Sequence, residues 1–243
     1  MRNNMIMAIS FLLASSFASS TIAGPFSVTP VRIYMDTNDK AVAVTINNEG
    51  DDELVMQAEL YTWTQKPDGE DVLEPTEDLL LSPPIIKLAG KSKQVVRLAR
   101  LQPVGMDQQQ TYRMIVREIP EAKPNKGNLQ LQIAIAFSMP VFITPPGVKN
   151  KLDCHTSKKT TDTISISCEN TGTAYAQVID FTFNGPENLS LSDNASGGYI
   201  LPGVKRNFNI KSEKGKLIPS GKGILSVRMD DGSKQTFDVI LTE

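Results

Sequence analysis

The sequence predicts an all-β protein made of two immunoglobulin-like β-sandwich domains. From residue 25 onward, apolar residues recur with a period near two rather than 3.6. The 15 Pro and 16 Gly are spread along the chain and punctuate it at short intervals. No long amphipathic helical pattern is found, and short strands between turn signals are typical of sandwiches and barrels.

The expected strands come in two sets. The first covers residues 42–46, 55–63, 94–98, 112–116 and 129–137. The second covers residues 163–168, 176–183, 205–210, 223–229 and 235–241. Turn signals separate them at residues 47–50, 67–69, 88–91 and 230–232. The best candidate for a linker between domains is the Pro-Pro-Gly at residues 145–147, which divides the chain into domains 24–145 and 146–243. Each domain is then close to the size of an immunoglobulin-like sandwich, about 100 residues.

Residues 1–23 have the pattern of a secretory signal peptide. Arg2 supplies the positive start, residues 5–17 are an apolar run too short to span a bilayer, and Ala23 ends a small-residue cleavage motif. An N-terminal core helix is the alternative. Because no later segment reads as a membrane span, we expect an exported protein that is not integral to a membrane.

Composition excludes several classes of site. The 25 Lys and Arg against 27 Asp and Glu give a net charge of −2, so there is no general electrostatic reason to bind nucleic acid. A single histidine, His155, excludes a cluster of histidine ligands, and two cysteines exclude a four-cysteine zinc site. We therefore expect no metal and no cofactor.

The two cysteines are expected to pair. Export places Cys154 and Cys168 in an oxidising compartment, where a disulfide between them would close a small loop. Two free buried thiols are the alternative.

Residues 127–148 contain no charged side chain and carry the longest alternating pattern. One face of the expected strand is apolar throughout: Leu129, Leu131, Ile133, Ile135, Phe137 and Met139. A central strand covered on this face explains the pattern. An edge strand that is routinely paired with another chain explains it equally, because a long uncharged edge is otherwise a template for aggregation.

Several short motifs decide between these alternatives by their order and spacing. In the first half they are residues 28–32 (VTPVR), 45–48 (TINN), 82–88 (SPPIIKL), 94–97 (QVVR), 112–113 (YR), 116–120 (VREIP) and 131–135 (LQIAI), together with Trp63. In the second half they are residues 169–172 (ENTG) and 201–203 (LPG). Together they resemble the periplasmic chaperones of the chaperone–usher pilus assembly pathway.

The resemblance implies two immunoglobulin-like domains joined at an angle, with a cleft between them. It also implies a periplasmic protein that binds, folds and caps pilus subunits and delivers them to an outer-membrane usher. The last strand of the first domain would be lent to a pilin that lacks one strand, and the alternating Leu131, Ile133 and Ile135 match the donated residues. Leu129 and Phe137 extend the same face.

The family further anchors the C-terminal carboxylate of the subunit with two basic residues. Arg32 matches the first of them, but Pro140 stands where the family has a lysine. Arg113, on the neighbouring strand, is the candidate substitute, because its planar fork can donate two hydrogen bonds to a carboxylate. A solvated strand arginine is the alternative. Gln109 and Thr144 also replace a charged pair of the family, which indicates a divergent branch resembling the archaic, spore-coat-like systems.

No nucleophile elbow or glycine-rich phosphate loop is found, so an enzyme is not expected. The alternative to a chaperone is an exported immunoglobulin-like structural or adhesive fimbrial protein. A pilin of this pathway, however, would be a single domain without its last strand.

Overall fold

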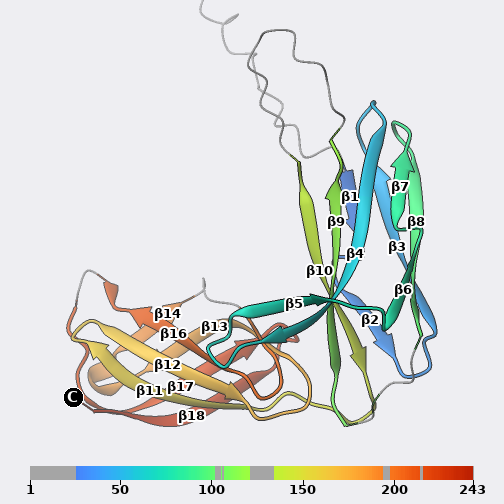
Figure 1. Ribbon diagram of the computed structural model, residues 1–243. Helices are drawn as coiled ribbons and strands as arrows, with labels where there is room; N and C mark the ends of the chain where they lie inside the picture. Colours follow the sequence, from blue (N-terminus) through green and yellow to red (C-terminus); the bar gives the residue numbers. More distant parts are fainter. Residues whose placement is uncertain are drawn as a thin grey trace, which may run out of the picture.

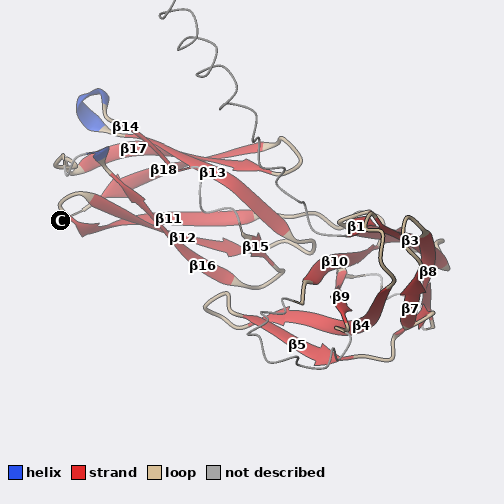
Figure 2. Ribbon diagram, turned by 90° about the horizontal axis from the view of Figure 1, so that it is seen from above, coloured by secondary structure: helices blue, strands red, loops and turns tan. Residues whose placement is uncertain are grey.

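The computed structural model describes residues 26–101, 105, 107–120, 134–193, 198–213 and 216–242. Within these residues the chain forms eighteen strands and one short 3-10 helix, η1 (Pro186–Asn188). The strands assemble into four sheets, and every pairing is antiparallel except that of β2 with β10. The all-β prediction is confirmed (Figure 2).

Strands β1 to β10 form the two sheets of domain 1. The first sheet has the order β1-β3-β8-β6, with β1 (Phe26–Thr29), β3 (Ala41–Asn48), β8 (Lys93–Arg100) and β6 (Leu79–Ser82). The second has the order β2-β10-β9-β4-β5, with β2 (Ile33–Asp36), β10 (Ala136–Thr144), β9 (Gln110–Glu118), β4 (Leu54–Gln65) and β5 (Asp71–Pro75); β7 (Ile85–Leu88) also pairs with β4.

Strands β11 to β18 form the two sheets of domain 2. The smaller sheet has the order β11-β12-β16, with β11 (Leu152–Thr160), β12 (Thr163–Asn170) and β16 (Lys205–Lys211). The larger has the order β14-β13-β17-β18, with β14 (Ser190–Asp193), β13 (Ala176–Asn184), β17 (Gly221–Met229) and β18 (Lys234–Leu241); β15 (Tyr199–Ile200) also pairs with β13.

The two domains are set at an angle, like the arms of an L (Figure 1). Strand β10 ends at Thr144 and β11 begins at Leu152, so the domain boundary predicted between residues 145 and 146 falls in the connection between them. Its position within that connection stays a prediction. The expected signal peptide lies outside the described residues.

Each domain has its own apolar core, because strand residues of one parity face inward in both sheets. Two domain 1 side chains are exceptions. Trp63 of β4 and Phe142 of β10 are fully buried, but they belong to the core of domain 2. The junction between the domains is therefore partly apolar, and it extends the core of domain 2 onto one end of domain 1.

The two cysteines form a disulfide, as predicted. Cys154 in β11 and Cys168 in β12 lie directly opposite each other and are both buried. Strand β11 itself is absent from the sequence-based expectations, because only Leu152 and Cys154 of its nine residues are buried apolar side chains. The remaining residues of β11 are mostly polar, so the sequence alone shows no clear alternation of apolar and polar residues there.

Candidate functional site at the junction of the two domains

Aromatic side chains from both domains pack together at the junction. Phe142 of β10 stacks on Tyr175, which precedes β13, with ring centroids 4.1 Å apart. Trp63 meets the edge of Tyr199 of β15 at 5.1 Å, and Tyr34 of β2 lies 5.7 Å from Phe142. Aromatic pairs at these separations contribute about 0.5–1.5 kcal/mol each beyond their buried area. The cluster fixes where the charged groups of the junction lie.

The two candidate anchor arginines meet at one of these rings. The guanidinium carbon of Arg113 lies 3.7 Å from the ring centroid of Trp63 and 5.5 Å from that of Tyr199. The guanidinium carbon of Arg32 lies 5.8 Å from the centroid of Tyr199. The structure thus brings Arg32 and Arg113 to the same aromatic ring, although they are distant in the sequence.

The strand register explains this meeting. Arg113 in β9 lies opposite Pro140 in the antiparallel β9–β10 pair. In the parallel β2–β10 pair, Ile33 lies beside Val141, and extending that register by one residue places Arg32 beside Pro140. Arg32, Pro140 and Arg113 therefore form a row across three adjacent strands, and the two arginines flank the position where the family has a lysine.

Each arginine already contacts a carboxylate of the chain. Arg32 forms an ion pair with Asp230, in the turn between β17 and β18 of domain 2. The Nη2 atom of Arg113 lies 3.6 Å from a carboxylate oxygen of Asp71 in β5. Side chains of Arg113 and Asp230 are each 14% exposed, against 33% for Arg32 and 46% for Asp71. The ion pair between Arg32 and Asp230 joins the two domains.

Burial and neighbouring groups shift the pKa values at the junction. Burial lowers the pKa of Arg32, but hydrogen bonds with Tyr34 and Asp230 outweigh it, so the net shift is upward. Burial lowers the pKa of Arg113, with Asp71 opposing. An arginine nevertheless stays protonated in proteins. Burial also raises the pKa of Tyr199, against the effect of the two arginines. The junction thus holds two permanent cations beside a neutral phenol.

Two glutamines connect the domains through neutral hydrogen bonds. Gln109 donates to the hydroxyl of Thr144 at 2.9 Å and accepts from the backbone N–H of Tyr175 at 2.9 Å. Gln65 at the end of β4 donates to the backbone C=O of Tyr199 and accepts from the backbone N–H of Leu201. A neutral amide–hydroxyl contact therefore stands where the resemblance implied a charged pair.

The start of β10 carries the described part of the expected donor strand. Ile135 and Phe137 are half-buried and pack against the core of domain 1, and Phe137 meets the edge of Phe26 at 5.0 Å. Ala136 and Ser138, on the opposite face, are exposed. Leu129, Leu131 and Ile133 lie outside the described residues. The predicted alternation is thus confirmed for the described part, while the role of the strand stays a prediction.

Within the residues that the structure describes, no strand pairs with the outer edge of β10 along residues 136–140. Of the strands that the structure describes, β2 lies on that side, and its register covers Val141–Thr144. The backbone C=O of Ile135 accepts a hydrogen bond from the backbone N–H of Glu118 in β9, so it faces the inner side of the strand. Since backbone groups alternate sides along a strand, those of Ala136, Ser138 and Pro140 face the outer edge. Pro140 has no N–H, and its C=O faces Ile33 at the start of β2, so the free donors of this edge lie at Ala136 and Ser138.

Sequence reasoning missed several junction residues. Asp230 reads as an ordinary turn residue before Gly232, and Tyr199 stands in a two-residue strand. Gln65 carries no local signal, because its partners are backbone groups of the other domain. The sequence directs attention to this region through the motif residues Arg32 and Trp63, and through Arg113, Gln109 and Thr144, which depart from the family pattern.

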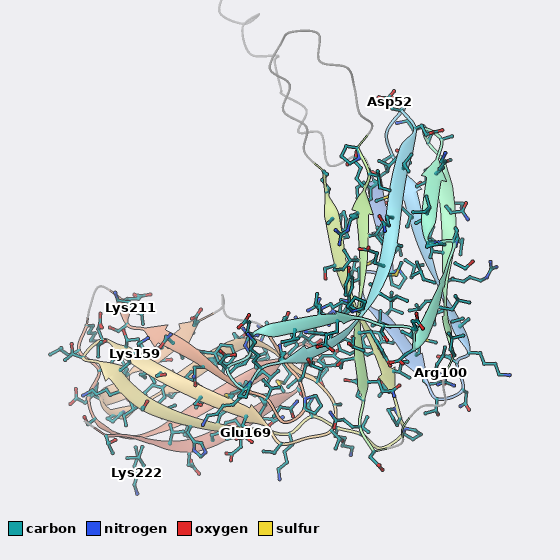
Figure 3. All side chains as sticks on the ribbon, viewed as in Figure 1. Asp52, Arg100, Lys159, Glu169, Lys211 and Lys222 are labelled. Atoms are coloured by element: carbon teal, nitrogen blue, oxygen red, sulfur yellow. A yellow bond between two sulfur atoms is a disulfide. The ribbon has the colours of Figure 1, made fainter. Side chains whose placement is uncertain are left out.

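Other kinds of site receive no support within the described residues. No group of three or more His, Cys, Asp or Glu side chains there is arranged to hold a metal ion. None of the described helices has the length and apolar character needed to cross a membrane. Figure 3 shows Asp52 at the outer tip of domain 1 and Lys159 and Lys211 at the far end of domain 2, away from the junction.

Comparison with known proteins agrees with this geometry. The chain is 31% identical over 140 residues to the chaperone protein PmfD of Proteus mirabilis (strain HI4320), covering 56% of this chain and 52% of that protein. It is 24% identical over 157 residues to the chaperone protein LpfB of Salmonella typhimurium, covering 63% and 64%. The matches therefore span about half to two thirds of the length of these curated relatives.

Solved structures share the fold. The chaperone–tip adhesion subunit complex CsuC–CsuE, from archaic chaperone-usher Csu pili of Acinetobacter baumannii, matches with a TM-score of 0.65 at 19% identity, covering 90% of this chain and 99% of that one. The YadV chaperone matches with a TM-score of 0.60 at 16% identity, covering 89% and 100%. The prediction of two immunoglobulin-like domains is confirmed.

The family profile described as the pili and flagellar-assembly chaperone, PapD N-terminal domain, matches residues 25–149. That range ends just beyond β10 and includes Arg32, Arg113 and the start of β10. The matched segment covers half of the chain, and the fold of its relatives covers both domains. The chain therefore belongs to the family of pili and flagellar-assembly chaperones.

Proposed function

We propose that this protein is a periplasmic chaperone that binds, folds and caps pilus subunits by donor-strand complementation and delivers them to an outer-membrane usher. The observation that carries the proposal is the outer edge of β10 at residues 136–140. No strand of the described part of the chain pairs with this edge, and it leads directly to the two arginines. An extended segment of a partner can pair with such an edge through main-chain hydrogen bonds.

The apolar side chains of the strand supply the second part of the interaction. Ile135 and Phe137, together with Leu129, Leu131 and Ile133 before them in the sequence, would present one apolar face to the groove of an incomplete pilin. Each such side chain contributes about 1.5–3 kcal/mol when fully buried. Several together hold the subunit soluble until transfer.

Arg32 and Arg113 would bind the C-terminal carboxylate of the subunit. Their guanidinium groups both lie near Tyr199, and arginine donates paired hydrogen bonds to a carboxylate. Pro140 between them has no side-chain donor, so Arg113 takes the place of the lysine of the family.

A periplasmic location and a role without catalysis complete the proposal. The signal-like residues 1–23 and the disulfide in domain 2 support an oxidising compartment. The function requires no cofactor and no catalytic group. The related complex CsuC–CsuE pairs a chaperone with a tip adhesion subunit, which supports a partner of the same class here.

Co-purification tests the proposal. The tagged protein is expressed in the periplasm together with the small secreted proteins encoded beside its gene, and it is then purified. We expect a single small subunit to co-purify in a one-to-one complex. Recovery of the protein alone, with the candidate subunits folded and free, would contradict the proposed function.

A further inference from the structure

Each candidate anchor arginine already lies beside a carboxylate of the chain. Arg32 forms an ion pair with Asp230, and a carboxylate oxygen of Asp71 lies 3.6 Å from Nη2 of Arg113. A third guanidinium, that of Arg206, donates to the backbone C=O of Tyr199 at 3.0 Å. Asp230 is only 14% exposed, and two carboxylates held close together disfavour each other's ionised form. A subunit carboxylate that binds Arg32 therefore competes with Asp230 for the same guanidinium.

We propose that the Asp230 carboxylate is paired with Arg32 in the free chaperone, and that the C-terminal carboxylate of the subunit displaces Asp230 from Arg32. This inference rests on the proposed function. Asp230 is favoured over Asp71 as the competing carboxylate because it is the one paired with Arg32, and its low exposure leaves that ion pair less screened by solvent. Asp71 is 46% exposed, so solvent already screens its contact with Arg113.

The surroundings of Asp230 allow its side chain to turn away while its backbone stays in place. Its backbone N–H donates to the C=O of Gln177 at 3.0 Å, which fixes the start of the turn. The hydroxyl of Tyr175 lies 3.4 Å from the carboxylate and remains as a donor when Arg32 is taken over. The displaced carboxylate consequently keeps a hydrogen-bond partner.

The exchange also changes how the domains are connected. Arg32 belongs to domain 1 and Asp230 to domain 2, so capture of a subunit removes one ionic contact between them. The neutral contacts of Gln65 and Gln109 remain, because neither involves Asp230. Subunit capture and the link between the domains are thereby coupled through a single side chain.

A matched pair of variants tests the exchange. Asp230→Asn removes the competing charge, and Asp231→Asn removes the same charge from the next residue, whose carboxylate accepts from the backbone N–H of Ser233 within the turn. The probe is an acetylated, fluorescein-labelled ten-residue peptide of alternating valine and threonine, with either a free or an amidated C-terminus. Fluorescence polarisation gives the dissociation constants.

We expect Asp230→Asn to bind the free-acid peptide about three- to tenfold more tightly than the wild type, as expected from the loss of one partly exposed ion pair. Asp231→Asn should bind it like the wild type, and the amidated peptide should not distinguish the three proteins. Unchanged or weaker binding of the free acid by Asp230→Asn overturns the exchange, as does a failure of this variant to bind it at all.

The same peptides separate this inference from the proposed function. If the wild type binds the free-acid and amidated peptides equally well, and Arg32→Ala does the same, then the protein has no carboxylate anchor. That part of the proposed function would then be wrong. If the wild type prefers the free acid but Asp230→Asn changes nothing, the exchange alone fails.

A measurement on the wild type covers the case in which Asp230→Asn does not fold. In carbon-13 and nitrogen-15 NMR spectra, the carboxyl carbon of Asp230 and the guanidinium nitrogens of Arg32 should both shift when the free-acid peptide is added. The amidated peptide should move neither. A shift of Arg32 with Asp230 unmoved would mean that the two carboxylates share the arginine, and this would overturn the exchange.

Discussion

In both domains a buried asparagine side chain holds loop backbone against the core through hydrogen bonds. Asn48 in domain 1 and Asn170 in domain 2 are both fully buried, and each is followed two residues later by a glycine whose N–H donates to its side-chain oxygen. The amide of Asn48 donates to the carbonyls of Asp52, Leu88 and Ala89. The amide of Asn170 donates to those of Ala174 and Ile200.

The domains differ at their edges. The β18 edge of domain 2 carries Lys234 and Asp238, and charges of this kind discourage pairing with other chains. The β10 edge of domain 1 carries no charge, and residues 136–140 lack a neighbouring strand within the described part of the chain. Domain 2 also holds both cysteines of the sequence in one disulfide. One sandwich is thus protected and cross-linked, while the other has an uncharged edge that no described strand covers.

The largest expected effect comes from substitutions in the apolar face of the strand that leads into the uncharged β10 edge. Replacing Ile133 and Ile135 together by aspartate should abolish subunit capture, with affinity reduced by a thousandfold or more, roughly as expected from several kcal/mol for each carboxylate buried in an apolar groove. Co-purification with the subunit measures the loss, and circular dichroism reports the fold. Ile240→Asp, on the β18 edge where Ile240 is 59% exposed, is the matched control and should retain capture. Unfolding of the double variant would instead show that the fold of domain 1 depends on these side chains, of which Ile135 packs against its core.

The shared asparagines test whether the domains are independent. Asn48→Ala and Asn170→Ala should each lower the free energy of unfolding of their own domain by about 3 kcal/mol, because each leaves buried backbone groups without a partner. Hydrogen exchange followed by mass spectrometry resolves the two domains. If either variant loosens both domains equally, the sandwiches unfold as one unit.

The disulfide should matter only to domain 2. Replacing Cys154 and Cys168 by alanine should destabilise that domain by about 3 kcal/mol in the chain-entropy account of a short loop. The melting of domain 1 and subunit capture at low temperature should be unchanged, because β10 lies in the other domain. Loss of capture by a variant with a folded domain 1 would show that the junction depends on the disulfide.

The arginine pair gives the smallest of these effects. Arg32→Ala and Arg113→Ala should each weaken subunit capture about ten- to a hundredfold, since a hydrogen bond to a charged group contributes about 1.5–3 kcal/mol. The double variant should lose less than the product, because the two side chains share one carboxylate. The exposed Arg97→Ala, on β8 of the opposite sheet, is the control. Binding of Arg113→Ala like the wild type would leave Arg32 as the sole anchor.

Local patterns predict much of the fold, because they reside within single strands. The alternation in β3, β4 and β12, and the turn before Gly232, follow directly from neighbouring residues. Strand β11 does not, since its outward face is polar and only its partner β12 fixes it. At the junction, Arg32 was predictable because a family motif marks it, and Arg113, Gln109 and Thr144 were predictable because they stand where the family has other residues. Asp230 and Gln65 act through contacts between residues more than a hundred positions apart, which no local pattern encodes.

Pro140 has a consequence for how far a bound strand can slide. A strand added to the outer edge of β10 finds N–H donors at Ala136 and Ser138 and then a gap at Pro140, beyond which β2 occupies the edge. Slipping the added strand two residues toward the junction would leave one of its carbonyls facing that gap. In the proposed complex, Pro140 would therefore limit this sliding and set the register of the partner strand. Because Pro140 lies directly opposite Arg113, the end of the partner chain would stop beside the arginines.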